Sequence, residues 1–142
     1  MPPFLLALAG ALVFAFYDAV GYFVVTTRGG KDAPGQAVAG YRVIQTLFQV
    51  TLAALLATVG GGRCAGAFVL IWWFGACDLL YYVLLRQAVP ATLTWIWWTP
   101  AGLAFLVRDS LQKGKLWKRP ISRGLFVAQS LAGVAVGYAV AR

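Results

Sequence analysis

Two aspartates lie inside apolar stretches of the sequence and are the first candidates for chemistry. Asp18 lies in "FAFYDAVGYF" and Asp78 in "FGACDLLYYV", where almost every neighbour is lipid-soluble. A carboxylate at membrane depth costs on the order of 3 kcal/mol or more, so each side chain is expected to face the interior of a helix bundle. Asp32 and Asp109 fall outside the apolar runs and are expected at the surface.

The same aromatic pattern surrounds both buried acids. F-x3-D-x3-Y occurs twice, centred on Asp18 and on Asp78. At this spacing an aromatic ring lies one helical turn on either side of each acid. The pattern indicates either an internal duplication, as in transporters built from repeats, or a coincidence in a chain that is 15% aromatic.

The available residue types limit the chemistry. The sequence has no histidine, and its four acidic residues are all aspartates. Histidine-activated nucleophiles and carboxylate-rich metal clusters are therefore excluded, and we predict no metal and no cofactor. Two nearby carboxyl groups could instead share a proton, which suits proton-for-cation exchange or general acid catalysis. In the structural alternative, each acid only hydrogen-bonds Tyr, Thr or Gln and joins helices.

The composition shows what kind of element must hold these acids. The 142 residues are 61% hydrophobic and 11% charged, whereas soluble domains are about 25% charged. We predict an all-α integral membrane helical bundle that forms one multi-pass domain, residues 1–142. Four apolar runs reach the length of about 20 residues needed to cross a bilayer. They cover 3–27, 41–59, 65–85 and 121–141.

A fifth apolar stretch, 89–107, either spans the membrane or re-enters it. Its length favours a span, while Pro90 and Pro100 favour a broken segment. A span would put seven of the twelve basic residues inside, and re-entry would put ten of them inside. Both interpretations place the basic loop 108–123 in the cytoplasm.

The helical rise predicts that the two acids share a depth. The first and third spans run in the same direction, so at about 1.5 Å per residue both acids lie some 12 to 14 Å from the same surface. The second span begins at that surface, where Arg42 and Gln45 form a stripe that leads to Gln49. Around the two acids, the predicted binding residues are Tyr22, Gln45, Gln49, Tyr81, Tyr82, Trp95 and Trp98.

Five tryptophans gather around the third span and the fifth stretch, at positions 72, 73, 95, 97 and 98. Such a group forms either an interfacial belt or a pocket wall that holds organic cations or carbocationic intermediates. In the last span, Gly133 and Gly137 form a GxxxG packing face, either within the chain or between subunits.

Three functions fit these features. The first is binding or transport of a small organic or lipophilic solute, with the aspartates as proton or cation sites. The second is a membrane enzyme that acts on a lipid or isoprenoid by aspartate general acid catalysis, and the third is an accessory subunit. The predicted partners are the lipid bilayer, such a ligand, and further copies or a larger complex. Nucleic acid is excluded because the basic residues lie at the ends of apolar runs.

Overall fold

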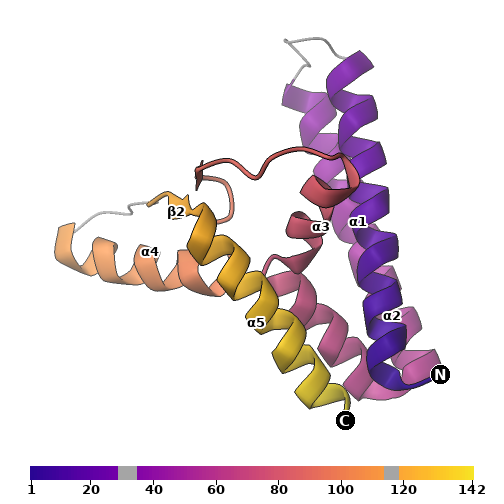
Figure 1. The fold of residues 1–142 in the computed structure, drawn as a ribbon. Coiled ribbons are helices and arrows are strands. Elements are labelled where there is room, and N and C mark those ends of the chain that lie inside the picture. The colour runs from indigo at the N-terminus through magenta and orange to yellow at the C-terminus, as the bar shows by residue number, and fades with distance from the viewer. Residues whose placement is uncertain (29–34, 114–118) are drawn as a thin grey trace.

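The computed structural model describes residues 1–28, 35–113 and 119–142, and this part of the chain is almost entirely helical (Figure 1). The helices are α1 (Pro3–Arg28), α2 (Gly35–Trp73), α3 (Ala76–Leu84), α4 (Pro100–Lys113) and α5 (Arg123–Ala141). Two short strands, β1 (Thr92–Leu93) and β2 (Ile121–Ser122), pair in an antiparallel manner. The all-α class predicted from the sequence is confirmed.

Three helical segments are long and apolar enough to cross a membrane: Pro3–Val25, Val38–Trp73 and Arg123–Ala141. The first and last agree with the predicted spans 3–27 and 121–141 to within about two residues at each end. Large apolar side chains on the outer face of α2, such as Val43, Leu47 and Val50, are exposed. An extended apolar surface of this kind is expected of a helix that faces lipid.

Two glycines interrupt the region predicted as the second and third spans. Gly61, within α2, has φ 79° and ψ 172°, and Gly75 precedes α3 with φ 85°. Side chains rarely allow such backbone conformations, which glycine adopts readily. Gly61 lies between the predicted spans 41–59 and 65–85 and separates them, whereas Gly75 breaks the second of these spans, so four continuous spans are not confirmed.

The chain reverses direction near Gly61 (Figure 1). A Cβ added to Gly10 of α1 would lie within 4 Å of both Leu56 and Phe68. In one straight helix those two residues would be roughly 18 Å apart along the axis, so α2 must fold back on itself between them. Its two halves both pack against α1.

The GxxxG face of α5 packs within the chain. A Cβ added to Gly133 would lie 2.9 Å from the Cγ atom of Phe74, and one added to Gly137 would lie 2.9 Å from Cγ1 of Ile71. The missing side chains thus let α5 approach the second half of α2 closely. This contact resolves the sequence alternatives in favour of packing inside the chain.

The stretch 89–107 does not form one helix. The segment before Pro100 is a loop that contains β1, and α4 begins at Pro100, a position where proline suits the first turn. Gln129 of α5 fixes this junction, because its amide donates to Thr99 Oγ1 at 3.1 Å and accepts from the Ala101 backbone N–H at 3.2 Å. α4 points away from the bundle, while both termini lie at one end of it (Figure 1).

Two apolar clusters hold this arrangement together. The first lies where α1 meets both halves of α2 and contains Phe14, Leu56 and Phe68. The second surrounds Phe126 of α5 and joins α3 to β1, β2 and the loop between α3 and α4. The second cluster therefore positions the loop against α3.

Candidate functional site

Asp18 is tied to the beginning of α2 by side-chain hydrogen bonds. It lies in α1 and is only 8% exposed. Its Oδ1 atom accepts hydrogen bonds from the Tyr41 hydroxyl and from Nε2 of Gln45, the latter at 2.5 Å. Arg42 extends the network, since its Nη1 atom donates to Gln45 Oε1 at 2.7 Å. These donors stabilise negative charge on Asp18.

Asp78 has a different environment in the first turn of α3. Its Oδ2 atom is buried and has no hydrogen-bond partner among the described residues. A buried oxygen without a donor costs about 1 to 3 kcal/mol, so a group that supplies a positive charge or a donor would be bound favourably here. Asp78 is consequently the acid whose hydrogen-bonding capacity the described residues leave partly unused.

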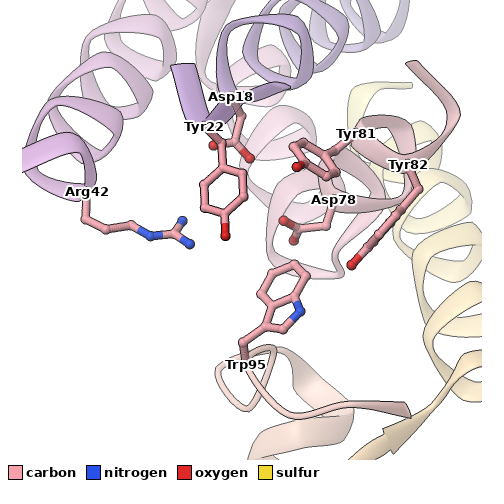
Figure 2. A pocket seen from close by; sticks show the side chains of 7 residues that line it. All are labelled: Asp18, Tyr22, Arg42, Asp78, Tyr81, Tyr82 and Trp95. Atoms are coloured by element: carbon pink, nitrogen blue, oxygen red, sulfur yellow. The ribbon is translucent and has the colours of Figure 1, made fainter. Parts of the chain in front are cut away.

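Both acids line one cavity of about 260 Å³. Figure 2 shows their carboxyl groups and the guanidinium group of Arg42 around the same space. Aromatic rings form the rest of the wall, with Trp95 opposite Asp78. The complete lining is Asp18, Tyr22, Arg42, Asp78, Tyr81, Tyr82 and Trp95.

A second cavity, of about 580 Å³, adjoins the first, because Arg42, Asp78 and Trp95 line both. Its polar lining residues come mainly from the first half of α2, and most of its other lining residues are aromatic. The polar wall consists of Arg42, Gln45, Thr46 and Gln49. The other residues are Phe14, Trp72, Trp73, Asp78, Trp95, Trp97 and Trp98.

Contacts between α2 and the loop before α4 order the tryptophan wall. The rings of Trp72 and Trp98 stack with centroids 4.7 Å apart and an angle of 17° between their planes. Trp73 donates its indole N–H to the Trp98 backbone carbonyl at 3.1 Å. The tryptophans that could have formed an interfacial belt therefore line a cavity.

Each predicted site residue lies on the wall of one of the two cavities. Asp18, Tyr22, Asp78, Tyr81, Tyr82 and Trp95 line the first, and Gln45, Gln49 and Trp98 line the second together with Asp78 and Trp95. The sequence argument did not include Tyr41 or Arg42 among the binding residues. Two sequence features could have identified them: the four-residue spacing from Tyr41 to Gln45, and the helix stripe of polar residues that begins at Arg42. The function of all these residues stays a prediction.

The prediction of a surface position for Asp109 is wrong. This residue is 6% exposed, and its Oδ1 atom lies 3.7 Å from Nε of Arg108. It lies on the buried side of α4. Hydropathy alone did not show where this helix begins, because the loop before it belongs to the same apolar stretch. Asp32 lies outside the described residues.

The described ranges contain no group of three cysteine, histidine or acidic residues that could hold a metal ion. The arrangement supplies instead one hydrogen-bonded acid, one acid with a free oxygen, a guanidinium group and aromatic faces. Such a site can bind a cation and can accept or release a proton. The chain matches no family model, no curated protein and no solved structure.

Proposed function

We propose that this chain is a membrane protein that binds a small organic cation between Asp18 and Asp78 and exchanges it for a proton. The observation that carries the proposal is the buried Oδ2 atom of Asp78, which lacks a partner among the described residues. This acid lines a cavity with a second acid and with aromatic rings. Carboxylates and aromatic faces are the groups that proteins use to hold organic cations.

Charge balance supports exchange of one proton for one cation. The site contains two carboxyl groups and the guanidinium group of Arg42. When Asp78 carries a proton, the charges of Asp18 and Arg42 cancel. When Asp78 loses that proton and a monovalent cation binds, the site is neutral again. In a medium of low dielectric constant, two neutral states cost much less than a charged intermediate.

Transport also requires a membrane arrangement, and four passes fit the chain reversal at Gly61. In this arrangement α1, the first half of α2, residues 62–84 and α5 cross the bilayer, and the third crossing is broken at Gly75. The basic segment 108–123, which includes the end of α4 and β2, then faces the cytoplasm with ten of the twelve basic residues on that side, as the distribution of positive charge favours. Both termini at one end of the bundle support an even number of passes.

An enzyme is the second candidate, because the two acids differ in their hydrogen bonds. Pairs of carboxyl groups in unequal environments commonly divide the roles of acid and base. Asp78 would then protonate a lipid or isoprenoid, while Asp18 stabilises positive charge. The third candidate, an accessory subunit, has less support, because the GxxxG face that could have packed between subunits is internal.

The test is isothermal titration of the purified protein with tetramethylammonium at several pH values. A proton competes with the cation at Asp78, so affinity should rise with pH, and about one proton should leave for each cation bound. Titration in buffers of different ionisation enthalpy counts that proton. Asp78→Asn should weaken binding at least tenfold, on the order of 1.4 kcal/mol, and remove its dependence on pH.

Asp32→Asn, a change between the first two predicted spans, is the control and should bind like the wild type. Unchanged affinity and pH dependence in Asp78→Asn would disprove the exchange site. The enzyme would be established instead by two results together. The wild type would transfer a proton to an isoprenoid but bind no ammonium ion, and this proton transfer would stop in Asp78→Asn.

A further inference from the structure

The two cavities differ in size and chemistry although they share part of their walls. The first, of about 260 Å³, lies below the 300 to 1,000 Å³ typical of pockets for drug-sized ligands. It has room for a compact charged group. The second, of about 580 Å³, is lined by five aromatic residues that the first lacks, namely Phe14, Trp72, Trp73, Trp97 and Trp98.

The junction between the cavities lies at the acid with the unpartnered oxygen. Asp78 and Trp95 belong to both walls, so a molecule whose charged group binds Asp78 in the first cavity has the second cavity directly beside it. Trp72 and Trp98 are fixed against each other by stacking, which leaves a flat and preorganised apolar surface. Such surfaces bind planar rings better than flexible chains, because stacking adds to the burial of area.

We propose that the ligand is an amphiphilic amine, with its ammonium group between the two acids and a planar apolar body in the tryptophan-lined cavity. This inference rests on the proposed cation site and extends it to the class of substrate. Arg42 contributes to specificity, since it lies on both walls and repels a second positive charge near the ring system. The ligand class is therefore a monovalent amine with one aromatic or polycyclic end.

Three quaternary ammonium probes test the division of the site by isothermal titration. Tetramethylammonium supplies the head alone, and benzyltrimethylammonium and heptyltrimethylammonium add bodies with equal carbon numbers but different shapes. We expect the benzyl probe to bind about tenfold more tightly than tetramethylammonium, and more tightly than the heptyl probe.

Substitutions in each cavity should separate the two contributions. Trp98→Leu should reduce the advantage of the benzyl probe about fivefold and should weaken the benzyl probe more than tetramethylammonium, because Trp98 lines only the second cavity. Its backbone carbonyl can still accept the hydrogen bond from Trp73. Asp78→Asn should weaken all three probes by a similar factor. Tyr138→Leu, on a residue of α5 that lines neither cavity, is the matched control.

The outcomes distinguish this inference from the proposed function. If tetramethylammonium binds in an Asp78-dependent way but the benzyl group adds nothing, only the bipartite ligand is disproved. The same conclusion follows if the heptyl probe binds best, or if Trp98→Leu weakens every probe equally. If no ammonium probe binds, the cation site itself fails.

Discussion

The two F-x3-D-x3-Y segments have one sequence pattern and two different structures. Around Asp18 the helix is continuous, and Phe14 is buried within 6.5 Å of the ring centroids of Phe48 and Phe68. Around Asp78 the helix is broken just before the acid, at Gly75, so Asp78 lies in the first turn of α3. The pattern thus fixes the spacing of aromatic rings along a helix but not the partners of the acid.

This difference indicates that the two acids have different roles. The hydrogen bonds to Asp18 connect α1 to α2, so this acid contributes to the fold as well as to the charge of the cavity. Asp78 Oδ2 has no such bond among the described residues, and the dipole of α3 favours negative charge at its first turn. An acid that the fold does not use is the better candidate for exchange of protons and cations.

The largest expected effect on stability comes from comparing Asp18→Ala with Asp78→Ala. The first change removes the acceptor for Gln45 and one of two acceptors for Tyr41, whose hydroxyl also donates to the backbone carbonyl of residue 18 at 3.0 Å. We expect a loss of about 2 to 3 kcal/mol in the free energy of unfolding. Asp78→Ala should cost less than about 1 kcal/mol, because a buried and unsatisfied oxygen disappears with the side chain.

Thermal unfolding in one detergent measures both variants. Asp18→Asn serves as the matched control, since the amide oxygen can still accept a hydrogen bond and should recover part of the loss. Equal destabilisation by both alanine substitutions would show that the two acids play the same structural role.

A smaller effect is expected from Tyr41→Phe. This change removes only a hydroxyl, while the ring stays in place against Gly21, whose added Cβ would lie 2.5 Å from Cε2 of Tyr41. Loss of a hydrogen bond to a charged acceptor should lower the free energy of unfolding by about 1 to 2 kcal/mol. Tyr138→Phe, at an exposed ring of α5, is the control and should leave the melting temperature unchanged. A similar shift of the melting temperature in both variants would show that the hydrogen bond from Tyr41 to Asp18 does not stabilise the fold.

Much of the site could be predicted because it depends on regular helix geometry. The depth argument needs only the rise per residue and the direction of the spans, and the residues that it grouped, Asp18, Asp78 and Gln49, line two adjoining cavities. The limits of α1 and α5 followed from long apolar runs bounded by polar segments. Hydropathy predicts the limits of such helices well, because each limit depends on the composition of a single segment and not on contacts with other segments.

The features that could not be predicted depend on contacts between distant segments or on single backbone angles. β1 pairs with β2 across the whole of α4, and the second apolar cluster holds the intervening loop. Gly61 is the middle residue of the run Gly60–Gly62, whereas nothing in the sequence marks Gly75, and these two alone among the described glycines have positive φ.

The smallest expected effect tests the helix break at Gly75, which precedes Asp78 and has no counterpart near Asp18. Gly75→Ala places a Cβ on a residue with φ 85°, and that atom would lie 2.9 Å from Cε2 of Phe126. A left-handed conformation costs a side-chain residue about 1 kcal/mol, and the ring must also shift. Gly62→Ala is the matched control, because its Cβ would meet nothing within 4 Å and alanine favours the helix by about 1 kcal/mol. We therefore expect Gly75→Ala to unfold at a lower temperature than the wild type and Gly62→Ala at the same or a higher one. If Gly75→Ala were instead more stable, a continuous helix through residue 75 would be accessible, and the break at Gly75 would not be what distinguishes Asp78 from Asp18.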